Sequence, residues 1–225
     1  MNYAPLFEVI RDIKFRAGGG NKLTQAEVDA VNAALTPQLA VLAKPRALKD
    51  PAAFFASVRA KFGSLKASQV EGFETLLKAM EKWSVPDTAY GLATAFWETN
   101  RTMQPVREAY WLSEDWRKAN LRYYPHYGRG YVQLTWPANY AKADKELGLG
   151  GTLVANLNRA MEPKIAADVM VRGMEEGWFT GKKNADYAPD DYVGRRAIIN
   201  GKDHAHDIAA MARSFEDALK AGRWG

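Results

Sequence analysis

The sequence contains no cysteine among its 225 residues, and this absence excludes several kinds of chemistry. Disulfide bridges, thiolate metal sites and cysteine nucleophiles are all ruled out. Histidine is scarce as well, with only His126, His204 and His206. The closely spaced pair at 204 and 206 fits a solvated turn better than a set of metal ligands, so the sequence predicts no metal site.

Long hydrophobic runs are also missing. The N-terminal segment MNYAPLFEVIRDIKFR carries acids within its apolar part, which predicts neither a secretory signal nor a membrane span. We therefore expect synthesis in the cytoplasm without a signal peptide, and no stable insertion into a membrane. The net charge of +5 would attract polyanions. Because the basic residues are scattered rather than clustered, they fit a solubilising role as well, and we expect no nucleic-acid partner.

Apolar residues make up 47% of the chain, which at this length is enough for one substantial core and a small satellite. The first 83 residues resemble a helical module with a loose internal repeat, because FEVIR at 7–11 is similar to FASVR at 55–59 and a helix start follows each. Thr24 and Ser68 are the expected N-caps of those helices. We therefore place a small N-terminal helical module at 1–83 and a second domain at 84–225. The module either packs its two helical hairpins on each other or on that domain, or it binds the cell wall or anchors another substrate.

A carboxylate lies near the end of the most apolar segment. Residues 88–100 are expected to form a helix that is apolar on nearly every side, and such a helix is buried. Glu98 lies near its end, where aromatic neighbours would remove water from the carboxyl group. Desolvation disfavours the charged form, and a carboxyl group that keeps its proton can serve as a general acid. A surface glutamate on a fraying helix end is the alternative.

A second carboxylate, Glu108, follows ten positions later, after Pro105. Proline ends regular structure, so Glu108 is expected on a loop, where it would stay ionised and could activate water. One acid that donates a proton and one carboxylate that activates water are what glycosidic hydrolysis requires. Alternatively, Glu108 forms an ordinary surface pair with Arg107. Glu114 and Asp115 are rival second acids, although they fit better in the first turn of a helix.

The segment YYPHYGRGYVQLTW at 123–136 is the most unusual part of the chain. Two glycines flank Arg129 and allow a tight backbone or the close approach of a ligand. Residues 131–135 alternate like a short strand, which would place Gln133 and Thr135 on one face. Beyond this segment, apolar periodicity predicts helices at 139–147, 164–177 and 207–221.

These motifs resemble glycoside hydrolase family 19, which contains plant-type chitinases and the peptidoglycan-cleaving lysozymes of phages and bacteria. The resemblance spans roughly residues 88–215. It departs from the family at Trp97, where many members have histidine, and at Asn100-Arg101, where many have two glycines. The motifs that carry it are, in chain order, Glu98-Thr99, Arg107-Glu108, YGRGYVQLTWPANY, Gly177-Trp178-Phe179 and Ile198-Ile199-Asn200-Gly201.

The resemblance implies a mainly α, two-lobed, lysozyme-like fold, with the catalytic domain at 84–225 and no metal or organic cofactor. Glu98 would be the general acid, Glu108 the general base, and Thr135 the hydroxyl that holds the attacking water. The reaction would invert the anomeric centre, which needs room for a water molecule between the carboxyl groups. The residues implied to line the sugar subsites or brace the acids are Tyr127, Arg129, Gln133, Asn139, Tyr140 and Asn200.

Bacterial peptidoglycan is the expected substrate. The chain lacks the signal peptide and cysteines of secreted plant chitinases, and its basic charge suits an anionic wall. We expect a monomeric endolysin of the phage type that reaches the periplasm after release by a holin and hydrolyses β-1,4 bonds. Three alternatives stay open: a chitinase acting on chitin oligomers, a lytic transglycosylase, which needs only one acid, and a non-catalytic wall-binding protein.

Overall fold

The computed structural model describes residue 24, residues 26–27 and residues 45–225, and the chain divides into two compact units, Met1–Lys44 and Pro45–Gly225. In the first unit, the Thr24 N–H donates to Glu27 Oε2 at 2.7 Å, and the Glu27 N–H donates to Thr24 Oγ1 at 3.3 Å. This exchange is a capping box, as expected for an N-cap at Thr24. Most of the first copy of the expected repeat lies outside the described residues.

The second unit begins with the helical hairpin expected for the second copy of the repeat, α3 (Pro51–Phe62) and α4 (Ala67–Ala79). Ser68 is not the N-cap of α4, because the helix begins one residue before it. Lys66 occupies the cap position, and its N–H donates to Gln69 Oε1 at 2.8 Å.

The hairpin shares its core with the C-terminal helices, so the domain boundary expected after residue 83 is wrong. Phe73 of α4 lies 5.7 Å, between ring centroids, from Phe215 of α10 (Ala205–Ala221). Phe62 of α3 lies 4.9 Å from Phe96 of α5 (Val85–Glu98). A helical hairpin cannot bury its apolar face alone, and here α5 and α10 cover it. The boundary between compact units falls at Lys44 instead.

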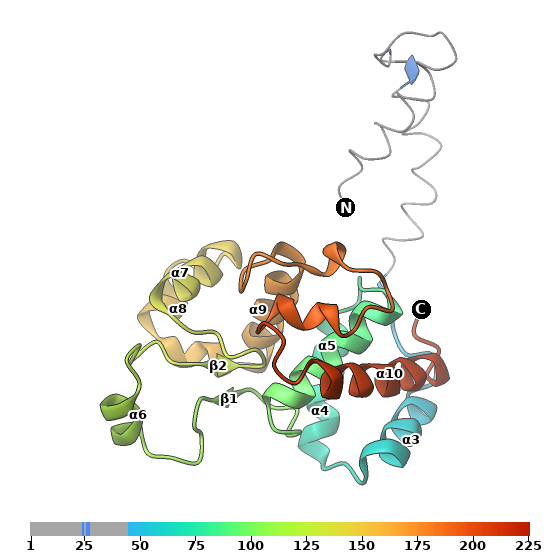
Figure 1. Cartoon of the computed structure of the whole chain (residues 1–225), viewed down its shortest axis with the longest axis horizontal. Coiled ribbons are helices and arrows are strands. Elements are labelled where there is room, and N and C mark those ends of the chain that lie inside the picture. The colour runs from blue at the N-terminus through green and yellow to red at the C-terminus, as the bar shows by residue number, and fades with distance from the viewer. Residues whose placement is uncertain (1–23, 25, 28–44) are drawn as a thin grey trace. The chain divides into compact units, whose positions relative to one another are not determined.

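Helix α5 is the buried helix that the sequence predicts, although it begins at Val85 rather than at 88. Ser84 Oγ accepts from the Asp87 N–H at 3.3 Å, which sets the earlier start. Every residue from Thr88 to Phe96 is buried, and α10 packs along the helix (Figure 1). Glu98 is therefore the last residue of a helix that is fixed by the core.

A second group of elements lies on the other side of this unit in Figure 1. Strands β1 (Val106–Arg107) and β2 (Arg129–Gly130) pair antiparallel, with Val106 opposite Gly130. Around them lie α6 (Glu114–Asn120), α7 (Pro137–Glu146), α8 (Thr152–Ala155) and the 3-10 helix η1 (Leu157–Met161). Helix α9 (Pro163–Glu176) packs against α4, and the 3-10 helices η2 (Asn184–Asp186) and η3 (Gly194–Ile198) precede α10.

The strand expected at 131–135 is wrong, because the chain reverses there. Arg129 and Leu134 exchange backbone hydrogen bonds of 3.2 and 2.8 Å across a tight turn. Gln133 has a φ of 55° in this turn, in the left-handed region. The three later helices are confirmed as α7, α9 and α10, each beginning one or two residues earlier than expected. None of the described helices has the length and apolar character needed to cross a bilayer.

Candidate active site

Glu98 extends from the end of α5 to a buried arginine. Its Oε1 accepts from Arg196 Nη1 at 2.7 Å, and its side chain is 17% exposed, against 2% for Arg196. The Arg196 Nε also donates to the Asp203 carbonyl at 2.8 Å, so the guanidinium is held from two sides. The direct partner of Glu98 is thus a charge, and not the aromatic wall expected from the sequence. Within the described part of the chain, Glu98 Oε2 has no hydrogen-bond partner.

Glu108 follows β1 directly, and both of its carboxylate oxygens accept hydrogen bonds. The Tyr123 hydroxyl donates to Oε1 at 2.6 Å, and the Gly128 N–H donates to Oε2 at 2.9 Å. The Glu108 N–H returns a bond of 2.7 Å to the Gly128 carbonyl. Burial and the bond to Glu108 raise the pKa of Tyr123 to about 12, so this hydroxyl stays a neutral donor at physiological pH.

The loops that follow the two acids are joined. Asn100 Nδ2, two residues after Glu98, donates to the hydroxyl of Tyr110, two residues after Glu108, at 3.1 Å. Asn100 and Tyr110 are both exposed, so the bond lies at the surface. The two acid-bearing segments therefore approach each other on a solvent-accessible side of the protein.

Glu114 and Asp115 lie in the first turn of α6, and Glu114 has a structural role there. Ser113 caps α6, and its Oγ accepts from the Trp116 N–H at 3.1 Å. Glu114, in the first turn, binds the Arg117 Nε at 3.1 Å and the Tyr127 hydroxyl at 2.9 Å. Desolvation works against the charge of Glu114, but these hydrogen bonds outweigh it and lower the pKa of the carboxyl group. Glu114 thus anchors α6 to the GRG segment.

Thr135 and its neighbours form a chain of hydrogen bonds that leads to Trp136, whose ring contacts the tyrosine that binds Glu108. Thr135 Oγ1 donates to the Gln133 carbonyl at 2.7 Å, and Asn139 Nδ2 donates to the Thr135 carbonyl at 2.9 Å. The next residue, Trp136, packs its ring 4.9 Å from Tyr123, the residue that holds Glu108. Gln133 Nε2 donates to the Val106 and Gly130 carbonyls at 3.2 and 3.3 Å, so this side chain fastens the strand pair.

Three of the residues expected at the sugar subsites lie inside the protein. Tyr127, Arg129 and Tyr140 are 1%, 4% and 0% exposed. Arg129 stacks on the Tyr127 ring at 3.7 Å and donates to the Tyr140 hydroxyl at 2.9 Å. The prediction that these three side chains contact a glycan directly is wrong for this conformation, because they are buried. They support the GRG segment from beneath, which is the bracing role that the family resemblance also allows.

Asn200 is exposed, and its N–H donates to the Arg196 carbonyl at 3.0 Å, which places it on the Glu98 side.

Sequence reasoning missed Arg196 and Tyr123, the two side chains that hold the acids. The only available signals were the adjacent Arg195 and Arg196 before an apolar motif, and a tyrosine preceding the GRG segment. Among the described residues, no group of three or more His, Asp or Glu is arranged to hold a metal ion.

No protein-family model and no curated protein matches the sequence. Among solved structures, this chain is similar to chitinase C from Streptomyces griseus HUT6037, with a TM-score of 0.53 and 19% sequence identity over 75% of each chain. The chain has a lysozyme-like fold of the family 19 chitinase type. This confirms the fold class that the sequence predicts.

Proposed function

We propose that this chain is a glycoside hydrolase that cleaves β-1,4 bonds of N-acetylated amino-sugar glycans, with bacterial peptidoglycan as its substrate. The observation that carries the proposal is the hydrogen bond between Asn100 and Tyr110, which joins the segments that follow the two acids. On a chitinase-like fold, this arrangement supports an acid and a base that act on one bond.

Glu98 is the proposed general acid. Its Oε1 is held by Arg196, and its Oε2 is left to take up a proton from solvent and donate it to the oxygen of the leaving sugar. As the proton leaves, Glu98 becomes a carboxylate, and the Arg196 guanidinium is already in place, with its Nη1 2.7 Å from Glu98 Oε1. A preformed positive charge of this kind stabilises developing negative charge without reorganisation.

Glu108 is the proposed general base. Tyr123 and Gly128 occupy one lone pair on each oxygen, and the remaining lone pairs can accept from a water molecule. That water attacks the anomeric carbon and gives a proton to Glu108 while the glycosidic C–O bond breaks. We propose that Thr135 helps to hold the water, since the hydroxyl that donates to Gln133 keeps its own lone pairs. The proposed stereochemistry is inversion, for which carboxyl groups lie roughly 6.5–9.5 Å apart.

The test is the release of new reducing ends from purified sacculi by the wild type, Glu98→Gln and Glu108→Gln. General acid or base catalysis is worth about 10²–10⁴-fold, so each variant should lose activity by that factor. Glu71→Gln, exposed on α4, is the matched control and should keep the wild-type rate. Unchanged release of reducing ends by Glu98→Gln would contradict the role proposed for this residue.

Chitin is the second candidate substrate, because the similar solved structure is a chitinase. A larger kcat/KM on chitin oligomers than on sacculi would select it.

We also propose an endolysin role in which a holin releases the protein to the periplasm. Cells that express the chain in the cytoplasm should lyse only when a holin is co-expressed, and lysis without a holin would contradict this route.

A further inference from the structure

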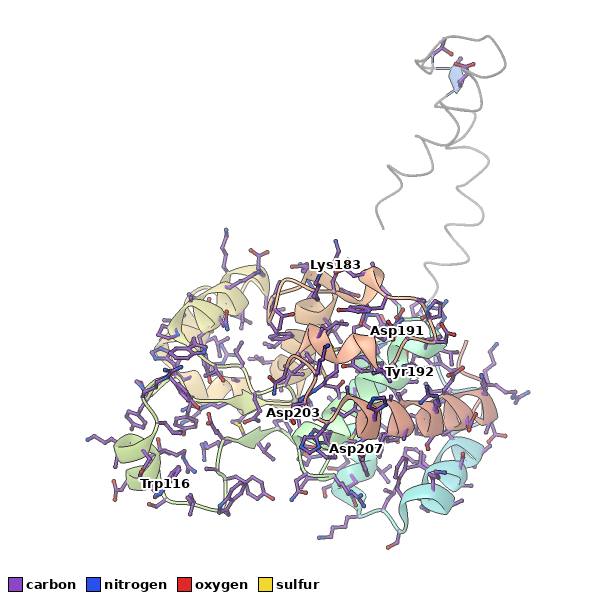
Figure 2. All side chains as sticks on the ribbon, in the orientation of Figure 1. Trp116, Lys183, Asp191, Tyr192, Asp203 and Asp207 are labelled. Carbon is purple, nitrogen blue, oxygen red and sulfur yellow. The ribbon has the colours of Figure 1, made fainter. Side chains whose placement is uncertain are left out.

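An open pocket of about 460 Å³ is lined by residues of α3, α5 and α10 and by Arg101, and it has no role in the chemistry proposed above. Trp97, the residue before Glu98, forms part of its wall, and Phe62 of α3 and Met211 of α10 add apolar surface. Lys61, Arg101 and Asp207 place charges around this surface. Figure 2 shows Asp207 near the start of α10. The volume lies within the range of about 300–1,000 Å³ typical of sites for small ligands.

The charge of this region is mainly positive. A smaller pocket of about 250 Å³ shares Arg101 and adds Lys66. Among the residues that the structure describes, Lys61, Lys66 and Arg101 form no ion pair, and all three are exposed. Three cations without acidic partners beside an apolar surface suit a ligand that carries carboxylates and apolar groups.

The backbone fixes Arg101 in place. Asn100, Arg101 and Met103 have φ values of 48°, 66° and 54°, in a region that residues other than glycine rarely adopt. The Arg101 N–H donates to the Phe96 carbonyl at 2.7 Å, and the Arg101 carbonyl accepts from Gln69 Nε2 at 2.8 Å. Backbone held in this region by surrounding contacts is concentrated at ligand sites. Arg101 thus lies at the edge of the pocket, three positions after the proposed acid in the chain.

We propose that this pocket binds the carboxylate-bearing stem peptide that branches from the peptidoglycan glycan, beside the bond that Glu98 protonates. The inference rests on the proposed function. Lys61 and Arg101 bind carboxylates of the peptide, Phe62 and Met211 contact its apolar side chains, and Asp207 faces an amino group. Chitin has no such branch, so the pocket would make the enzyme favour peptidoglycan over chitin.

The experiment compares kcat/KM on three substrates: peptide-bearing glycan strands, the same strands after an amidase has removed the stem peptides, and chitin oligomers. The variant is Lys61→Ala/Arg101→Ala. The control is Lys182→Ala/Arg223→Ala, which removes the same residue types from exposed positions. Arg223 also has a left-handed backbone, with a φ of 52°, so the control matches the strain of alanine at position 101.

The variant should lose about tenfold in kcat/KM on peptide-bearing strands, which corresponds to about one charge-assisted hydrogen bond. Its rate on denuded strands and on chitin should equal that of the control. Equal losses on all three substrates, or no loss on any, would overturn the stem-peptide site. A wild type that cleaves none of the three would instead contradict the proposed function.

Direct binding tests the site independently of catalysis. A soluble tripeptide containing glutamate and diaminopimelate is titrated into Glu98→Gln protein and followed by calorimetry. Adding Lys61→Ala and Arg101→Ala to the Glu98→Gln protein should weaken binding about tenfold. Binding to the Glu98→Gln protein should also weaken as the salt concentration is raised. The absence of binding at millimolar peptide, or binding that the two substitutions do not affect, would overturn the inference.

Discussion

At the scale of single residues, the pairing of Glu98 with Arg196 is the most consequential contact. Arg196 is almost completely buried, so its charge depends on Glu98 for compensation. Removing one partner of a buried ion pair leaves a charge without compensation, and this costs about 3–5 kcal/mol.

Arg196→Met should therefore lower the free energy of unfolding by about 3 kcal/mol, measured by chemical denaturation. Adding Glu98→Gln removes the orphaned charge, so the double variant should be more stable than Arg196→Met alone. Arg223→Met at an exposed position should change stability by no more than about 0.5 kcal/mol. Additive effects of the two substitutions at 98 and 196 would show that the pair is not coupled.

Tyr123 supplies the second prediction at this scale. Tyr123→Phe removes one donor from Glu108 and should lower kcat about tenfold with little change in KM, because the base is held less well. The fold should persist, since the ring contact with Trp136 remains possible. A change confined to KM would contradict a role in holding the base.

The pH dependence of Tyr123 follows from the same contact. Burial and the bond to Glu108 raise the pKa of Tyr123 to about 12, above the value near 10 for an unfolded chain. Its contribution to stability is therefore fully present below pH 10 and is lost between about pH 10 and 12. When the ultraviolet absorbance of tyrosinate is followed against pH, the wild type should show one tyrosine that ionises near pH 12 and that Tyr123→Phe lacks.

The positions of Glu98 and Glu108 in the fold were predictable from sequence because their signals are local: a buried helix that ends on a carboxylate, and a second carboxylate after proline. Their supports were not. Arg196 lies 98 positions from Glu98, and Tyr123 lies 15 positions from Glu108. Tyr127 and Tyr140 were expected at the subsites because sequence does not distinguish an aromatic ring that stacks on a sugar from one that supports the backbone beneath it.

At the scale of elements, the short helix α8 depends on one side chain. The Asp144 carboxylate accepts from the N–H groups of Gly151, Leu153 and Val154 at 2.6, 2.6 and 3.1 Å. Burial alone would raise the pKa of Asp144, but these backbone hydrogen bonds outweigh it and lower the pKa.

Asp144→Ala should lower the free energy of unfolding by about 1–3 kcal/mol at neutral pH, since one buried and two partly buried N–H groups lose their acceptor. Because the folded pKa is depressed, this contribution is present above about pH 3.9 and is lost as pH falls through the folded value. Denaturation of the wild type and the variant across this range should show their stabilities converging. Asp217→Ala, exposed on α10, is the control. A stability gap that persists in strong acid would contradict the capping role.

Helix α4 positions the loop that follows Glu98. A Cβ added at Gly72 would overlap the carbonyl oxygen of Met103, which lies in that loop. Alanine is favoured over glycine in helices by about 1 kcal/mol, but overpacking against a backbone atom costs about 1–3 kcal/mol. Gly72→Ala should therefore destabilise the protein and also reduce activity, whereas Ser68→Ala on the same helix should do neither. A more stable Gly72→Ala protein would show that the loop can move freely.

Elements with long amphipathic patterns were predictable, and short ones were not. Helix α9 has proline at its first turn and Gly177 at its C-cap with a φ of 73°, so both ends are marked in the sequence. The residues 131–135 alternate like a strand, but positive φ values at Gly130 and Gln133 turn the chain back instead. Five residues are too few for periodicity to decide between a strand and a turn.

At the scale of the whole molecule, the position of the domain boundary shows what sequence patterns leave undetermined. The helical hairpin of α3 and α4 was recognisable from its own residues, but its partners α5 and α10 lie far along the chain. Apolar faces do not specify which other face will cover them. The family resemblance supplied the fold class because the kind and order of its motifs can be recognised from the sequence without knowing which faces pack together.

The central claim, that Glu98 and Glu108 hydrolyse a wall glycan, is tested most directly by mass spectrometry of the products from purified sacculi. We expect glycan fragments with ordinary reducing ends, formed by the wild type and reduced about 10²–10⁴-fold by either Glu98→Gln or Glu108→Gln. Fragments lighter by one water, with anhydro ends, would identify a lytic transglycosylase. Tight binding to sacculi without any fragments would identify a wall-binding protein, and either result would contradict the account.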